Sequence, residues 1–260
     1  VTVYAGAGER GFKDGPAAAA LFSEVIGIVC DSLGNVYVAD SGNRRIRKIS
    51  PDGIVSTYAG NGEEGSTDGK SGEARFYAPN YLAFDRHKNL YVSDIGNFVL
   101  RKISADGMVT TLAGSGVSQY HDGQGKNSSF GKPQGIAVDA QDNVFLCDAT
   151  NRRIRKITPD GTVTSYAGDG ESRLIDGPAS TASFLDPESI AIDDAGNMFI
   201  GDAYAVRVIN TSGTVSTLAG SDHTGSTNGT GAAAGFSGLP GIGIDLCGNI
   251  YVADYFNTKM

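Results

Sequence analysis

Residues 135–157 read Gly-Ile-Ala-Val-Asp-Ala-Gln-Asp-Asn-Val-Phe-Leu-Cys-Asp-Ala-Thr-Asn-Arg-Arg-Ile-Arg-Lys-Ile. Residues 27–49 follow the same pattern and end in the same six residues, Arg-Arg-Ile-Arg-Lys-Ile. Short apolar runs alternate with Asp, Asn and Gly, which is typical of short β-strands joined by tight turns. A chain that repeats such a unit is expected to have a repeat architecture.

An Ala-Gly step marks each copy of the unit. Its glycine recurs at Gly6, Gly60, Gly114, Gly168 and Gly220, at intervals of 54, 54, 54 and 52 residues. The 260 residues therefore predict a single domain of five repeats. The repeats are residues 1–54, 55–108, 109–162, 163–214 and 215–260, the last of which is incomplete.

Each complete repeat carries four predicted strands. In the third repeat they are residues 136–139, 143–148, 153–157 and 162–167. Four antiparallel strands per repeat predict the blades of an all-β propeller. Residues 2–5 are expected to form an opening fourth strand, and Met260 falls where the third strand of the fifth repeat should begin. We therefore expect these repeats to be part of a longer chain whose ring closes with five or six blades.

The pattern of residues 27–49 and 135–157 resembles the NHL repeat, and the resemblance covers essentially the whole chain. The longer cassette, Leu-Ala-Gly-x-Gly followed by Asp-Gly and then Phe, is similar to NHL propellers of secreted and cell-surface proteins, including teneurin-type adhesion receptors and bacterial envelope proteins. The resemblance implies a propeller that usually has six blades. It also implies an extracellular or cell-surface location and protein or glycan partners.

Composition narrows the classes of partner. Lys and Arg number 21 against 29 Asp and Glu, which gives a net charge of −8, opposite in sign to that of a general nucleic-acid binder. The basic strands at residues 44–48 and 152–156 are the only argument for polyanion binding, and pairing of their arginines within the molecule is favoured. No run approaches the 18 apolar residues of a membrane span, so neither nucleic-acid binding nor membrane insertion is expected.

The second and fourth strands of a blade run in the same direction, so the loops that follow them emerge on one face. The long loops carry a ring of acidic turns that would suit cations or sugars, although turn formation explains them equally well. Structural capping is favoured for the Asp that ends each second strand, and a Phe at a constant place in each loop is expected to anchor it. The acidic turns are at Asp14, Asp68, Asp122 and Asp176, and with Tyr120 and His121 they form the candidate interaction surface.

Two breaks in the pattern add candidates to that surface. Phe98-Val99-Leu100 replaces the Arg-Arg-Ile of its sibling repeats and is either an interface patch or ordinary core. The segment after Asp202 is two residues shorter than its siblings and places Tyr204 in the turn. Such a shortened turn either provides a binding site for a partner or reflects sequence drift on an exposed edge. Sequence drift is the favoured explanation.

Three sequons place candidate N-glycosylation sites at Asn127, Asn210 and Asn228, all in predicted loops or turns. The three cysteines, Cys30, Cys147 and Cys247, have neither the spacing of a metal site nor that of a disulfide framework.

The alternative hypothesis is an enzyme. The resemblance extends to the amidating lyase and to gluconolactonase-like propellers, which use a divalent cation on the propeller axis. The histidines that could serve zinc are His87, His121 and His223, which fall in separate repeats. The sequence therefore favours a non-catalytic protein- or glycan-interaction module of a larger extracellular protein, with no cofactor. The alternative is a metal-dependent lyase or hydrolase.

Overall fold

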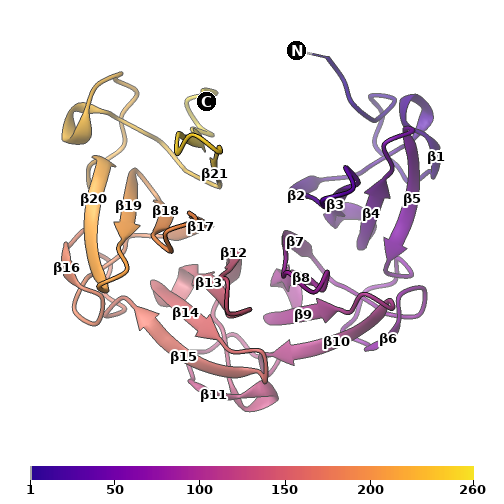
Figure 1. The fold of residues 1–260 in the computed structure, drawn as a ribbon, viewed down its shortest axis with the longest axis horizontal. Helices are drawn as coiled ribbons and strands as arrows, with labels where there is room; N and C mark the ends of the chain where they lie inside the picture. Colours follow the sequence, from indigo (N-terminus) through magenta and orange to yellow (C-terminus); the bar gives the residue numbers. More distant parts are fainter. Residues whose placement is uncertain (1) are drawn as a thin grey trace.

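A computed structural model describes residues 2–260 and arranges them as successive antiparallel sheets around a common centre (Figure 1). The all-β prediction is confirmed. Each sheet is a blade, numbered here 1 to 5 in chain order. The inner strands β2, β7, β12, β17 and β21 contact one another in this order and line the centre.

The strand bounds repeat from blade to blade. Blade 1 has β2 (Val25–Cys30), β3 (Val36–Asp40), β4 (Arg45–Ile49) and β5 (Ile54–Ala59). Blade 2 has β7 (Pro79–Phe84), β8 (Leu90–Asp94), β9 (Val99–Ile103) and β10 (Met108–Ala113). Blade 3 has β12 (Pro133–Val138), β13 (Val144–Asp148), β14 (Arg153–Ile157) and β15 (Thr162–Ala167). Blade 4 has β17 (Pro187–Ile192), β18 (Met198–Asp202), β19 (Ala205–Ile209) and β20 (Thr214–Gly220), and blade 5 has β21 (Gly241–Ile244) and β22 (Ile250–Ala253).

The prediction of four-stranded blades is corrected for blades 1 to 4. Each long loop contributes a two-residue strand that pairs with the outermost strand, so these sheets have five strands in the order β1-β5-β4-β3-β2 and its equivalents. The added strands are β1 (Gly15–Pro16), β6 (Gly69–Lys70), β11 (Gly123–Gln124) and β16 (Gly177–Pro178). The sequence did not reveal them because two residues carry no periodicity.

The expected opening strand is also corrected. Residues 2–5 form no strand, and the fifth repeat contributes a two-stranded sheet. The ribbon is accordingly an arc that runs from β2 to β21, with four five-stranded blades and one two-stranded sheet (Figure 1).

Short 3-10 helices complete the loops and turns. In blades 1, 2 and 3 the turn after the second strand is a 3-10 helix followed by one residue in the left-handed conformation, such as Arg152 with φ 51°. These helices are η2 (Ser41–Asn43), η3 (Ile95–Asn97) and η5 (Ala149–Asn151), and the long loops contain η1 (Ala17–Ala19), η4 (Gly125–Asn127) and η6 (Gly231–Ala233).

The core lies between blades rather than inside them. Phe76, Phe130 and Phe184 reach from the long loops and are fully buried, which agrees with their expected anchoring role. Phe130, for example, packs with Leu100 of blade 2 and Ile157 of blade 3. These three Phe side chains therefore fix their loops at the junctions between blades.

Candidate functional site on the loop face

The turns after the second strands and the long loops between blades meet on one face, called here the loop face. This follows from the antiparallel strand order, because the second and fourth strands end on the same side. Direct contacts show it: in blade 1, Asp40 at the end of β3 and Asp14 of the long loop both pair with Arg47 of β4.

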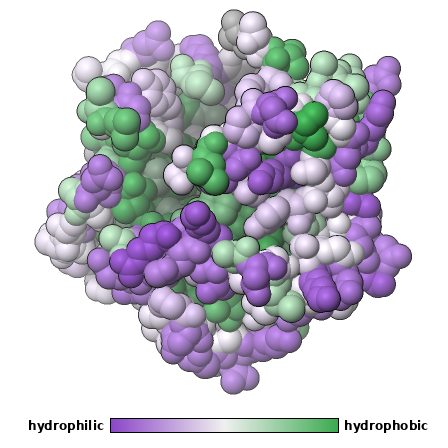
Figure 2. Space-filling view, turned by 45° about the vertical axis from the view of Figure 1, so that its right-hand side comes forward, coloured by the Kyte–Doolittle hydropathy of each residue, from purple (hydrophilic) through white to green (hydrophobic). Residues whose placement is uncertain are grey.

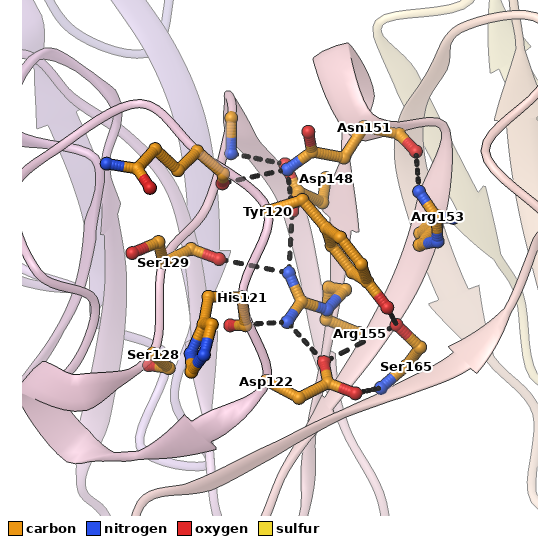
Figure 3. A network of polar contacts seen from close by, with 12 residues as sticks. Tyr120, His121, Asp122, Ser128, Ser129, Asp148, Asn151, Arg153, Arg155 and Ser165 are labelled. Atoms are coloured by element: carbon orange, nitrogen blue, oxygen red, sulfur yellow. Dashed lines mark hydrogen bonds and ion pairs between the residues drawn. The ribbon is translucent and has the colours of Figure 1, made fainter.

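Blade 3 shows the arrangement in detail (Figure 3). Arg155 of β14 donates from Nη1 to Asp148 Oδ2 at 2.9 Å and from Nη2 to Asp122 Oδ1 at 2.6 Å. The same guanidinium donates to the backbone carbonyl oxygens of Ser129 and His121, at 3.1 and 3.0 Å. The buried Arg155 side chain thus binds the long loop at two places, beside the acidic turn at His121 and Asp122 and further along the loop at Ser129.

We call this group the arginine clamp: a buried Arg of the third strand, the Asp that ends the second strand, and the Asp of the long loop. It recurs in four blades as Arg47 with Asp40 and Asp14, Arg101 with Asp94 and Asp68, Arg155 with Asp148 and Asp122, and Arg207 with Asp202 and Asp176.

Burial explains why the charges of the clamp are paired within the molecule. The four arginine side chains and the four strand-end Asp side chains have no exposed area, whereas the loop Asp side chains are 37–50 % exposed. A buried charge is tolerated only when it is paired and hydrogen-bonded. The expected pairing of arginines within the molecule is therefore observed, and both rings of Asp residues have a structural task.

Two further arginines of the basic strands, Arg45 and Arg153, stack on aromatic rings. Arg45 lies over the Phe12 ring at 3.9 Å from its centroid, and Arg153 lies over Tyr120 at 4.1 Å. Tyr120 also shares a hydrogen bond with Ser165 at 3.0 Å (Figure 3). Sequence reasoning missed these stacks, although a loop aromatic and a strand arginine at matching places in repeats 1 and 3 was a usable signal.

Two loop side chains precede each clamp Asp and differ from blade to blade. The clamp holds the backbone carbonyl of the second one, so its side chain is free to vary. The pairs are Phe12 and Lys13, Ser66 and Thr67, Tyr120 and His121, and Leu174 and Ile175. Phe12, Tyr120 and Ile175 are 40–45 % exposed. Large apolar side chains therefore face solvent from loop backbone that the clamp holds in place.

The two breaks in the pattern lie at different depths. Val99 and Leu100 are buried core residues, so of that segment only Phe98, half-buried and in the left-handed conformation, reaches the surface. Tyr204 is half-buried in the shortened turn.

The shortening has a chemical consequence at Asp202. In blade 3, Asn151 donates to Asp148 Oδ2 at 2.8 Å and to the Gln119 carbonyl at 3.0 Å. Asn43, Asn97 and Asn257 make the same pair of contacts, but the turn after Asp202 has lost this Asn. Burial raises the pKa of Asp202 to about 6, while its backbone donors and Arg207 oppose the shift.

The sequence candidates for metal binding and glycosylation are scattered over the surface. His121 Nδ1 lies 2.9 Å from the Asn127 carbonyl, His87 lies 3.2 Å from Asp142, and His223 lies 2.9 Å from Asp222. Within residues 2–260 no three His, Cys, Asp or Glu side chains group as a metal site would require. The sequon residues Asn127, Asn210 and Asn228 are all exposed.

An axial cavity of about 460 Å³ gathers polar side chains from equivalent positions of three inner strands, Asn80, Gln134 and Glu188. Burial and the neighbouring Asp186 raise the pKa of Glu188, and Lys132 and Gln134 partly offset this. Zinc prefers His and Cys ligands, and calcium takes six to eight oxygens. These three side chains offer no His or Cys to zinc, and their carboxylate and amide oxygens are ligand types that calcium takes together with backbone carbonyls and waters.

Comparison with known proteins matches residues 167–237 to the family model described as the Teneurin NHL domain. The chain is 29 % identical over 255 residues to the chloroplastic protein SUPPRESSOR OF QUENCHING 1 of Arabidopsis thaliana, which covers 90 % of this chain and 24 % of that protein. It is 26 % identical over 273 residues to NHL repeat-containing protein 2 of Bos taurus, covering 90 % and 37 %.

The chain is a member of the NHL-repeat β-propeller family. A solved structure of a Bacteroides thetaiotaomicron protein of unknown function shares the fold of this NHL propeller, with a TM-score of 0.62, 24 % identity and coverage of 99 % of this chain and 73 % of the other. The NHL propeller spans only 24 % and 37 % of the lengths of the two curated relatives above.

Solved structures with the fold of this NHL propeller differ in role. One is a streptogramin B lyase, with TM-score 0.60, 16 % identity and coverage of 91 % and 64 %. Another belongs to a nidogen/laminin complex, with TM-score 0.62, 17 % identity and coverage of 92 % and 74 %. The fold therefore accommodates both enzymes and interaction modules. No helix within residues 2–260 is long and apolar enough to cross a membrane.

Proposed function

We propose that this NHL propeller is a non-catalytic interaction module whose loop face binds protein or glycan partners, as part of an extracellular or cell-surface protein. The observation that carries the proposal is the arginine clamp with its variable pairs. A constant buried scaffold presents different side chains at each blade, which is how rigid folds commonly support recognition by loops.

The chemistry of the face suits such partners. Tyr120, Phe12 and Ile175 supply exposed apolar area, and the half-exposed Phe98 and Tyr204 add to it. The clamp carboxylates Asp14, Asp68, Asp122 and Asp176 keep part of their surface accessible between these groups. Aromatic anchors surrounded by polar groups are typical of protein and sugar recognition.

The proposed location has support of two kinds, namely the match to the Teneurin NHL domain and the exposure of the three sequon asparagines. Glycans at Asn127 and Asn228 would restrict which part of the loop face a partner reaches, because both residues lie in the long loops.

The test exchanges one variable pair for another that the chain already uses. The double variant Tyr120→Ser with His121→Thr installs in blade 3 the pair found in blade 2, and it leaves the clamp residue Asp122 intact. Wild type and variant are applied to arrays of secreted proteins and of glycans, and their thermal unfolding is compared.

We expect the variant to bind a partner of the wild-type protein with an affinity at least tenfold lower. Its Tm should stay within a few degrees of that of the wild type. Equal binding by both proteins, or no binding by wild type to either array, would overturn the proposal. Native mass spectrometry that finds one divalent ion, lost on chelation together with turnover of a small ester or lactone, would establish the enzyme alternative instead.

A further inference from the structure

The face opposite the loop face, called here the hairpin face, carries a cavity that the proposed function does not use. Its volume is about 570 Å³, within the range of small-molecule sites. It lies between blades 1 and 2, with Tyr37, Lys48 and Tyr58 of blade 1 on one side and Phe84 of blade 2 on the other. The turns after β2 and β7 form its rim.

Three aromatic rings line this cavity. Tyr37 lies edge-to-face with Tyr58 at 4.9 Å and with Phe84 at 5.0 Å between centroids. Tyr37 is buried, while Tyr58 and Phe84 are half-buried. Edge-to-face rings leave faces and edges that suit a further planar ring.

The aromatic trio is specific to this junction. The equivalent trios are Tyr91, Leu112 and Val138 between blades 2 and 3, Phe145, Tyr166 and Ile192 between blades 3 and 4, and Phe199, Leu218 and Ile244 between blades 4 and 5. The repeat therefore requires an aromatic residue only at the first of the three positions in each trio. Tyr58 and Phe84 together exceed what the architecture needs.

The cavity lining carries three positive side chains, Lys48, Arg86 and Lys88, and two negative ones, Asp31 and Asp85. Asp31 and Asp85 accept four hydrogen bonds each, all from the Asx-type turn that follows or from the nearby Tyr hydroxyl. Arg86 is paired with Asp142 at 3.1 Å. Lys48 and Lys88 make no ion pair within residues 2–260.

Lys48 is placed to meet a ligand above the rings. Its Nζ lies 5.8 Å from the Tyr37 centroid. The equivalent Lys102 and Lys156 stack similarly on Tyr91 and Phe145, so the lysine belongs to the repeat and only its combination with the trio is special. Burial raises the pKa of Tyr58, so its hydroxyl keeps its proton and can donate to an anion.

We infer that the cavity between blades 1 and 2 binds a small aromatic anion, an aryl carboxylate or a related aryl acid, with its ring against Tyr37, Tyr58 and Phe84 and its charge at Lys48. The site is separate from the loop face. Its failure and that of the proposed function are therefore independent.

The cysteines of the chain provide the readout. Cys30 is exposed and lines the cavity, Cys247 is exposed in the corresponding turn region of blade 5, and Cys147 is buried. The intact chain is treated with N-ethylmaleimide at increasing 2-naphthoate, and the alkylation of each cysteine is followed by peptide mass spectrometry. Uncharged 2-naphthamide and non-aromatic cyclohexanecarboxylate are the comparison compounds.

We expect saturating 2-naphthoate to slow alkylation of Cys30 at least fivefold and to leave Cys247 unchanged. Lys48→Met should raise the half-protecting concentration about tenfold, because it removes the charge and keeps the apolar stem. Tyr58→Leu and Phe84→Ile should do the same, and they introduce residues that blades 2 and 4 already carry at these positions. Tyr166→Leu, the matched change between blades 3 and 4, should have no effect.

Three results would overturn the inference. The first is no protection of Cys30 at millimolar 2-naphthoate. The second is equal slowing at Cys30 and Cys247, and the third is protection by 2-naphthamide or cyclohexanecarboxylate equal to that by 2-naphthoate. Far-UV circular dichroism and the Tm of each variant establish that it is folded. Lys48 is half-exposed, so Lys48→Met still tests the inference if a variant of a more buried residue does not fold.

Discussion

At the scale of single residues, Asp202 differs from the other clamp carboxylates. Leu185 and Asp186 donate backbone N–H groups to it at 2.9 and 2.7 Å, and Arg207 pairs with it at 3.1 Å. The side-chain amide that the equivalent positions receive from Asn is absent because the turn is two residues shorter. A fully buried carboxylate with one donor fewer holds its charge less well.

This predicts a specific pH dependence for Asp202→Asn. A pKa near 6 in the folded state, above the ordinary 3.8, means that the folded protein binds more protons than the unfolded chain between these values. Asp202 therefore adds stability as pH falls through this window and removes it as pH rises. Wild type should gain about 2 kcal/mol over Asp202→Asn between pH 7 and pH 4.5.

Urea denaturation of both proteins across this pH range measures the difference between their free energies of unfolding. The contributions of the other titrating groups are common to both proteins and cancel in this difference. A gap between the two free energies of unfolding that stays constant with pH would contradict the prediction.

At the scale of elements, the arginine clamp joins strand, turn and loop. Arg155 alone contacts the end of β13, two loop carbonyls and the Asp next to β11. The sequence predicted acidic turns in the long loops and a Phe at a constant place that anchors each loop. It could not show that an arginine 33 residues away in the chain organises the loop.

Arg155→Met is expected to destabilise the protein by about 3–5 kcal/mol, because it leaves the buried Asp148 without its cation. The control Arg173→Ala removes an exposed ion pair to Asp169, which should cost about 1 kcal/mol or less. Chemical denaturation of the two variants separates a buried from an exposed pair. Similar losses for both would show that the clamp is not a source of stability.

At the scale of the whole molecule, the close approach of inner strands sets the arc. A Cβ on Gly135 of β12 would lie 2.7 Å from Ser189 Cα and 2.8 Å from the Glu188 carbonyl oxygen of β17. The Tyr81 hydroxyl of β7 donates to the carbonyl of Pro240, next to β21, at 2.9 Å and so joins blade 2 to blade 5. Figure 2 shows apolar side chains clustered in the hollow of the surface that this view presents.

Gly135→Ala should therefore force blades 3 and 4 apart and lower stability by about 2–3 kcal/mol through overpacking. Gly243→Ala of β21 is the matched control, since its added Cβ meets no atom within 4 Å. Thermal unfolding should show a lower Tm for the first variant and little change for the second. A Tm of Gly135→Ala equal to that of Gly243→Ala would contradict the close-packing argument.

The repeat, the all-β class and the approximate places of the main strands follow from the sequence, because each depends on short-range patterns of apolar and turn residues. The start of the first strand does not: the pattern predicts residues 136–139, whereas β12 is Pro133–Val138. The sequence also located the acidic turns and the Phe anchors, which recur at fixed intervals. Three features became visible only in the folded chain: the acidic turns pair with buried arginines, Asp202 lacks the Asn donor, and Tyr37, Tyr58 and Phe84 meet around one cavity. These contacts join residues of different strands and blades, and their distances depend on how the blades pack.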